Sequence, residues 1–252
     1  MTSERRGTLV VTGGSRGIGA AVARAAAARG HDVAVGYLGR RDAAEGVAQE
    51  VIRAGGRAAV IRADVAREEE VVRIFEEATR SLGPVTALAT CAGVTGGFSR
   101  LEDVTGDTVA RVLAVNVTGT ILCAREAVRR MSTRRGGRGG AIVTVSSLAA
   151  QLGGPGEWVH YAASKGAVET FTVGLAREVA AEGIRVNAVS PGLVETELHA
   201  AAGDPDRPRR LAAGIPMGRP GTPAEVAEGM LWLLSPAASY VTGAILPIGG
   251  GR

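Results

Sequence analysis

The chain of 252 residues has few aromatic residues, two cysteines and almost no lysine. Aromatic side chains make up only 3% of it, so its core must be built from Val, Ala, Leu and Ile. Hydrophobic residues still reach 46%, which is enough for a sizeable core without disulfides. The two cysteines, Cys91 and Cys123, lack the spacing of a metal site. We therefore expect reduced thiols, no metal and a cytoplasmic location.

Long hydrophobic runs are also absent. No uninterrupted apolar stretch approaches the roughly 18 residues that cross a bilayer, so no membrane span is expected. The first residues, MTSERRGTLVVTGG, lead from polar residues into a strand-length run without the pattern of a secretory signal. The net charge is +4, with 29 basic and 25 acidic residues. Because no nucleic-acid-binding module is recognisable, we expect no nucleic-acid binding.

Apolar runs of strand length alternate with longer segments of helical period along the chain. Several of these runs are apolar throughout, which is typical of parallel strands buried on both faces. The alternation predicts one α/β domain over 1–252, a Rossmann-like doubly wound parallel sheet of about seven strands with helices on both faces. Strands are expected at 8–13, 32–37, 57–64, 85–93, 140–147, 184–192 and 244–249, and helices at 17–30, 41–54, 67–82, 107–134, 159–182 and 223–235.

The sequence TGGSRGIG, residues 12–19, lies where the first strand meets the first helix. Gly13, Gly17 and Gly19 depart from the G-x-G-x-x-G spacing of dinucleotide-binding loops, but their physical use is the same. Glycines let the backbone turn tightly and approach a pyrophosphate at a helix N-terminus. We expect a cofactor to contact Gly13, Ser15, Arg16, Gly17, Ile18 and Gly19. The alternative is a tight turn that only packs the helix against the strand.

The residues after the second strand indicate which dinucleotide binds. A site for NAD usually has a carboxylate there to hold the ribose hydroxyls, whereas this strand ends at Tyr37. Arg16 in the glycine loop and Arg40 and Arg41 after the strand supply positive charge instead, which suits a 2′-phosphate. NADP(H) is therefore predicted over NAD(H). The alternative is that Arg40 and Arg41 form the solvated start of a helix.

Tyr161 and Lys165, the only lysine of the chain, are four residues apart in YAASK and so share one helix face. A phenol ordinarily titrates near pH 10. A nearby ammonium stabilises the phenolate, so we expect Lys165 to lower the pKa of Tyr161. Such a phenol can exchange a proton with a carbonyl or alcohol oxygen. The alternative is a lysine whose stem packs along a tyrosine ring.

These motifs together resemble the short-chain dehydrogenase/reductase superfamily over nearly the whole chain. The matching segments are TGGSRGIG, CAG at 91–93, NVTG at 116–119, SS at 146–147, YAASK at 161–165, PGLVET at 191–196 and SYVTGAIL at 239–246. The resemblance implies an oxidoreductase that interconverts a ketone or aldehyde and an alcohol by hydride transfer with NAD(P), and it implies a homotetramer. Thr90 and Cys91 replace two asparagines of the family pattern, so the support of the neighbouring strand and helix is altered.

The resemblance also assigns roles. Tyr161 is expected to be the general acid/base, Ser147 to bond the substrate oxygen, Lys165 to tune Tyr161 and hold the nicotinamide ribose, and Asn116 to anchor a water that links Lys165 to solvent. Ser147 lies fourteen residues before Tyr161, where thirteen is usual, so Ser146 remains a rival for the serine role. Further cofactor contacts are expected from Asp64, Val65, Ala92, Gly93, Pro191, Gly192, Val194 and Thr196. Asp64 has an alternative role as a helix cap.

A substrate loop is expected at about 193–215, with help from 94–98 and 148–158. Leu193, Leu198, His199, Leu211 and Ile215, beside Trp158, predict a largely apolar pocket for a small carbonyl or alcohol. A 3-oxoacyl-carrier-protein or polyketide-type ketoreductase is the enzymatic alternative, because five arginines between 125 and 135 could dock an acidic carrier. A catalytically silent NADPH-binding regulatory protein is the alternative from another class.

Overall fold

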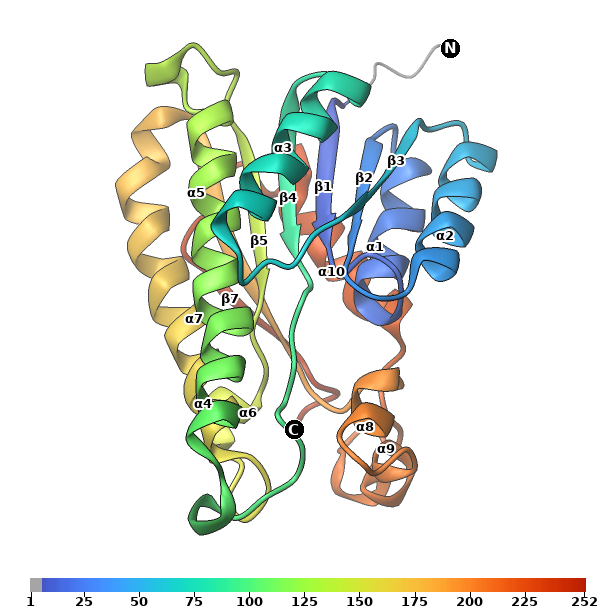
Figure 1. Ribbon diagram of the computed structural model, residues 1–252, viewed down its shortest axis with the longest axis vertical. Coiled ribbons are helices and arrows are strands. Elements are labelled where there is room, and N and C mark those ends of the chain that lie inside the picture. Colours follow the sequence, from blue (N-terminus) through green and yellow to red (C-terminus); the bar gives the residue numbers. More distant parts are fainter. Residues whose placement is uncertain (1–5) are drawn as a thin grey trace.

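A seven-stranded parallel sheet lies at the centre of the computed structural model, which describes residues 6–252 (Figure 1). Residues 1–5, on which the prediction of no signal sequence partly rests, lie outside this described part. The strand order β3-β2-β1-β4-β5-β6-β7 reverses direction between β1 and β4, which is the switch point of a doubly wound sheet. The predicted fold class is confirmed. The strands are β1 Thr8–Thr12, β2 Asp32–Tyr37, β3 Ala58–Arg62, β4 Val85–Thr90, β5 Gly140–Val145, β6 Ile184–Pro191 and β7 Ile245–Ile248.

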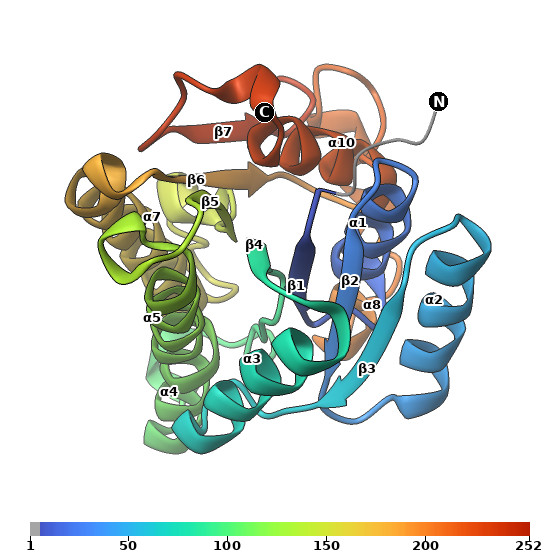
Figure 2. The same cartoon turned by 90° about the horizontal axis from the view of Figure 1, so that it is seen from above.

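Helices cover both faces of this sheet (Figure 2). On one face lie α1 Gly17–Ala27, α2 Arg41–Arg53 and α10 Pro223–Leu234, and on the other lie α3 Glu68–Leu82, α5 Gly119–Met131 and α7 Val159–Val179. Successive residues of a strand point to opposite faces, so Leu9 and Val11 enter one core cluster while Val10 enters the other. All five residues of β1 are buried, as an apolar run without alternation predicts.

The helix predicted at 107–134 is interrupted. It consists of α4 Gly106–Leu113, a π-helical turn Ala114–Thr118 and α5. By length and composition, Gly106–Met131 is apolar enough to cross a membrane. Its inward-facing residues Cys123, Ala124 and Ala127 are buried in the core with α3 and α7, which accounts for this composition. The interruption places Asn116 in the π-helical turn, a distortion that often marks functional sites.

Three short helices follow the carboxyl ends of β5 and β6, in segments where the sequence predicted no regular structure. They are α6 Ala149–Leu152, α8 Glu197–Ala201 and α9 Arg207–Arg210. Figure 1 shows them at the lower end of the molecule, toward which the strand arrows point. Helices of four or five residues are shorter than the window in which periodicity can be recognised. They complete the walls of a space beyond the carboxyl edge of the sheet.

Candidate active site

A cavity of about 620 Å³ opens at the carboxyl edge of the sheet, beside the switch point. It lies where ligands bind in open α/β sheets. Nearly all of the predicted site residues line it. These are Gly13, Ser15, Arg16, Gly17, Ile18, Gly19, Tyr37, Arg40, Asp64, Val65, Ala92, Gly93, Ser147, Tyr161, Lys165, Pro191, Gly192, Val194 and Thr196. Arg41 and Asn116 do not line it, and each is placed differently from the rest.

The turn between β1 and α1 has no room for side chains at two of its glycines. Gly13 has φ +64°, and a Cβ there would lie 2.8 Å from the backbone nitrogen of Ala92. A Cβ on Gly19 would collide with the carbonyl oxygen of Gly13. These glycines let the turn pack tightly against the loop after β4 and against itself, while Ser15 and Arg16 of the turn also line the cavity. A turn of this kind at the N-terminus of α1 fits a dinucleotide pyrophosphate. The residues present therefore fit a nicotinamide dinucleotide.

The loop after β2 divides the two predicted arginines. Arg40 lines the cavity and is exposed there, next to the buried Tyr37. Arg41 is already in α2, where its Nε donates to Glu45 at 2.7 Å across one helical turn. The prediction that Arg41 faces the cofactor is therefore not supported by its position. Of the two arginines, Arg40 alone carries positive charge to this wall of the cavity.

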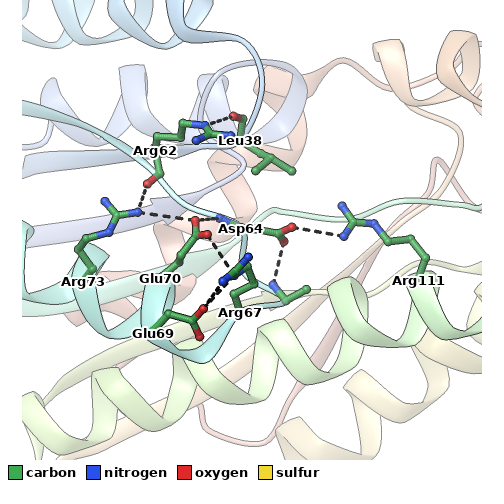
Figure 3. Close-up of polar contacts among 9 residues, drawn as sticks. Leu38, Arg62, Asp64, Arg67, Glu69, Glu70, Arg73 and Arg111 are labelled. Carbon is green, nitrogen blue, oxygen red and sulfur yellow. Dashed lines mark hydrogen bonds and ion pairs between the residues drawn. The ribbon is translucent and has the colours of Figure 1, made fainter.

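A network of arginines and acids fixes the loops at the same end (Figure 3). Arg111 of α4 reaches the carboxylate of Asp64 at 3.3 Å. The other oxygen of Asp64 accepts from the backbone N–H of Ala66 at 3.0 Å. Asp64 therefore closes a tight turn ahead of α3 but is not its cap, because the N-cap residue is Arg67. It lines the cavity, and its contact with the cofactor stays a prediction. Arg62 donates to the carbonyl oxygen of Leu38 at 3.1 Å and holds the loop after β2.

Tyr161 and Lys165 lie on one face of α7, and both are about 95% buried. The Lys165 ammonium is 5.6 Å from the centre of the Tyr161 ring and donates to the carbonyl oxygen of Val145 at 2.8 Å. The Ser147 side chain lies beside the Tyr161 phenol and lines the same cavity. The ends of β5 and α7 thus bring a serine, a phenol and an ammonium to one wall of the cavity.

The pKa values of this group are set by burial. Removal from water raises the pKa of Tyr161 to about 12, although the neighbouring Ser147 hydroxyl opposes the rise. The expected lowering of this pKa by Lys165 is wrong for this structure, because the ammonium faces the ring and Val145 while burial disfavours the phenolate. Burial also lowers the pKa of Lys165 to about 8. The phenol is therefore protonated at neutral pH.

The two adjacent serines point to different partners. Ser146 is buried and donates to the carboxylate of Glu169 at 2.8 Å and to the backbone of Lys165 at 3.2 Å. Ser147 lies beside the phenol of Tyr161, and its hydroxyl accepts from the backbone N–H of Ala149 at 3.1 Å. Ser146 therefore holds strand to helix, whereas Ser147 is the serine whose hydroxyl adjoins the phenol.

Asn116 lies behind this wall. Its side-chain amide nitrogen donates to the carbonyl oxygen of Val94 at 2.8 Å and to the hydroxyl of Ser164 at 3.0 Å. Its amide oxygen accepts from the backbone N–H of Val94 at 2.9 Å. A Cβ added to Gly93 would lie 3.4 Å from that oxygen and 3.7 Å from the Lys165 ammonium. Asn116 therefore joins the π-helical turn to the loop after β4 and to α7.

Comparison with known proteins decides the family. A family model described as "Enoyl-(Acyl carrier protein) reductase" matches residues 13–252. The chain is 50% identical over 243 residues to the uncharacterised oxidoreductase YgfF of Escherichia coli strain K12, covering 96% of this chain and 98% of that protein. It is 35% identical over 252 residues to a 3-oxoacyl-[acyl-carrier-protein] reductase of a Synechocystis species, with 100% and 98% covered. A short-chain type dehydrogenase/reductase structure from Mycobacterium marinum matches with a TM-score of 0.91 at 36% identity, covering 98% and 95%.

The chain belongs to the short-chain dehydrogenase/reductase family. It is therefore an oxidoreductase that acts on CH–OH and C=O groups, and the proteins of this family use nicotinamide cofactors. The family resemblance expected from the sequence motifs is therefore confirmed over residues 13–252.

The far end of this oxidoreductase's cavity is aromatic. Trp158 is 94% buried, stacks on Phe98 with ring centres 4.6 Å apart, and lies 5.3 Å from the Tyr161 ring. Leu193, Leu198 and His199 line the cavity as predicted, and His199 is buried beside Trp158. Leu211 and Ile215 are not among the lining residues.

One residue at this end lies in the predicted substrate loop, but its own role was not predicted. Arg207 of α9 lines the cavity and is 95% buried, with its guanidinium carbon 4.7 Å from the centre of the Trp158 ring. It pairs with Glu157, which precedes α7. In the sequence, Arg207 belongs to the polar run DPDRPRR, which is typical of a solvated loop.

The lowered pKa of Lys165 predicts how its removal changes stability with pH. Because Lys165 titrates near 8 when folded and near 10.5 when unfolded, the unfolded chain binds more protons between these values, and stability rises with pH there. The Lys165→Met variant lacks this dependence. The free energy of unfolding of the variant minus that of the wild type should therefore be about 3 kcal/mol more positive at pH 7 than at pH 10.5. Urea denaturation at both pH values measures this.

The matched control is Arg177→Met, which removes one exposed charge from the same helix. Its effect on the free energy of unfolding should be the same at both pH values. An equally pH-independent effect of Lys165→Met would show that burial does not perturb this ammonium.

Proposed function

We propose that this enzyme reduces the carbonyl group of a small ketone or aldehyde to an alcohol with NADPH, and that Tyr161 donates the proton. One observation carries the proposal: Ser147 and Tyr161 are neighbours on one wall of the same cavity that the glycine turn between β1 and α1 lines. The turn fits the phosphates of a dinucleotide. The hydroxyls of Ser147 and Tyr161 fit the oxygen of a substrate carbonyl group placed next to them.

The raised pKa of Tyr161 supports the direction of reaction. When bound, the nicotinamide supplies the hydride to the carbonyl carbon. Ser147 orients the carbonyl oxygen, and the Tyr161 hydroxyl gives its proton to the oxygen as negative charge develops there. A phenol with a pKa near 12 stays protonated at neutral pH, as a general acid must. Alcohol oxidation would instead need the phenolate as a base, which a raised pKa makes scarcer at neutral pH.

Lys165 and Asn116 lie where they can return a proton to Tyr161. With a pKa lowered to about 8 by burial, the Lys165 ammonium releases a proton more readily than an exposed lysine. The amide donors of Asn116 bind Val94 and Ser164, and its oxygen accepts from the Val94 backbone. That oxygen keeps a second lone pair, which can bind a water that would link Lys165 to solvent. Lys165 also holds the nicotinamide ribose, while Val194 and Thr196 hold the carboxamide.

The residues at and after the end of β2, which line one side of the cavity, favour NADP(H) over NAD(H). No carboxylate stands at the end of this strand, where Tyr37 is buried instead. Arg16 and Arg40 line the cavity and carry the positive charge that a 2′-phosphate needs.

The two adjacent arginines give a matched test of this preference. Arg40→Ala should weaken NADPH binding by about tenfold, the loss of one charge-assisted hydrogen bond, and leave NADH binding nearly unchanged. Arg41→Ala should leave both affinities unchanged, because Arg41 pairs with Glu45 outside the cavity. Fluorescence titration with both cofactors measures this. Equal losses of NADPH affinity in the two variants, or tighter binding of NADH by the wild type, would contradict the assignment.

A ketoreductase acting on a carrier-bound acyl chain is the second candidate, because one relative is a 3-oxoacyl-[acyl-carrier-protein] reductase. The arginines expected to dock the acidic carrier are largely paired within the chain. Arg125, Arg129 and Arg130 all bond to Glu126, and Arg134 bonds to Glu182. Paired arginines attract an acidic partner weakly, so this arrangement favours a free small-molecule substrate. A silent NADPH-binding regulator has no use for the buried pair of Ser147 and Tyr161.

We also propose a cytoplasmic homotetramer with a substrate segment at about 193–215. Large apolar side chains are exposed on α4, α5 and α10 and in the segment after α10. They are Leu113, Ile121, Trp232 and Tyr240. These positions fit contacts between copies through α4–α5 and the C-terminal segment.

Single substitutions separate the roles of the serines and of the phenol. Tyr161→Phe and Ser147→Ala should lower kcat by at least about a hundredfold, since each removes a group that contacts the reacting oxygen. NADPH should still bind to Tyr161→Phe. Ser146→Ala should keep kcat within about threefold and lower thermal stability instead, because Ser146 bonds Glu169 in the protein interior.

Steady-state assays of NADPH consumption with ketones, diketones and aldehydes provide the measurement. Loss of turnover in Ser146→Ala with full activity in Ser147→Ala would reverse the assignment of the two serines.

A further inference from the structure

Arg207 is a charged side chain in an otherwise largely apolar part of the cavity. Its side chain is 6% exposed, whereas the side chain of Glu157, its partner, is 36% exposed. Its guanidinium carbon lies 4.7 Å from the centre of the Trp158 ring and 5.5 Å from that of Phe98. Arg207 therefore stands at the aromatic end of the space that Tyr161 also lines.

The guanidinium retains binding capacity. It has five N–H donors in a planar fork, and its Nη2 donates to Glu157. Its Nε–H is buried and has no hydrogen-bond partner among residues 6–252. This Nε–H is closed off from the cavity, so a ligand oxygen would bind the Nη donors that Glu157 does not occupy.

The positive charge of Arg207 is buried, whereas its partner is open to water. Water screens the partly exposed Glu157 more strongly than the buried Arg207. At the neighbouring His199, burial lowers the pKa and repulsion by Arg207 lowers it further, while a hydrogen bond with the Val194 backbone and the carboxylates of Asp204 and Glu157 raise it. The guanidinium is the less screened charge of its ion pair, and it can attract an anionic group of a substrate.

We propose that Arg207 is a specificity-determining residue that binds a carboxylate of the substrate, so that the enzyme prefers ring-containing ketones whose carboxylate is separated by the ring from the reacting carbonyl. The inference rests on the proposed function, because Tyr161 must receive the carbonyl group. Trp158 adjoins both Tyr161 and Arg207, and it provides an aromatic surface for the ring. A guanidinium recognises a carboxylate through two parallel hydrogen bonds, which supplies selectivity as well as affinity.

The test compares matched ketones. With NADPH, kcat/KM is measured for 4-acetylbenzoate and for 4-methylacetophenone, which has the same ring and ketone without the charge. The wild type should prefer the carboxylate by at least about tenfold. Arg207→Met should lose this preference. Arg210→Met should keep it, because Arg210 lies on the same short helix but is exposed and pairs with Asp204.

Glu157→Gln separates substrate recognition from a purely structural role of the pair. If Arg207 binds the carboxylate, removing its competing partner should raise the preference for 4-acetylbenzoate above that of the wild type. If the pair only holds α9 in place, Glu157→Gln should resemble Arg207→Met, with lower thermal stability and equal losses for both ketones. That result would overturn the inference.

The remaining outcomes distinguish the two proposals. Reduction of 4-methylacetophenone without any preference for its carboxylate counterpart would overturn the role of Arg207 and leave the proposed function intact. NADPH binding without reduction of either ketone, or of any ketone, diketone or aldehyde in the wider panel, would overturn the proposed function itself.

Discussion

The site depends on the burial of a phenol and an ammonium together at the carboxyl edge of the sheet. Tyr161 and Lys165 are held one helical turn apart on α7, and α7 packs against β6 and the end of β5. Burial moves both pKa values toward the neutral forms, to about 12 for Tyr161 and about 8 for Lys165. As we propose, the protonated phenol of Tyr161 can donate a proton, and the easily deprotonated Lys165 can return one to it.

The fold supplies this arrangement through a few packing constraints. The switch point between β1 and β4 opens the space, and the glycine turn packs tightly against the loop after β4. Asn116 joins the π-helical turn to the loop after β4 and to α7, so the helix bearing Tyr161 is fixed from behind. The network around Asp64 and Arg111 fixes the opposite end. The reacting groups are therefore placed by rigid elements, while the short helices α8 and α9 define the substrate end.

Sequence patterns predicted the parts of the molecule that are determined locally. Apolar strand runs and the glycine turn identified the sheet and the phosphate-binding surface, and the i, i+4 spacing placed Tyr161 and Lys165 on one face. The spacing could not predict the direction of the Tyr161 pKa shift, because burial depends on what other elements pack over the ring. The positions of Arg41 and Arg207 were missed for a related reason. Both lie in charged runs, and only the folded chain shows that Arg41 pairs outward with Glu45 while Arg207 turns inward.

The most direct measurement follows the transferred hydrogen. NADPH carrying deuterium in place of both hydrogens at C4 is incubated with the enzyme and a ketone, and the alcohol is analysed by mass spectrometry and NMR. Hydride transfer to a carbonyl group protonated by Tyr161 predicts one deuterium on the carbinol carbon and a solvent-derived proton on its oxygen. An alcohol without deuterium on carbon, or no alcohol from any carbonyl compound in the panel despite NADPH binding, would contradict this account.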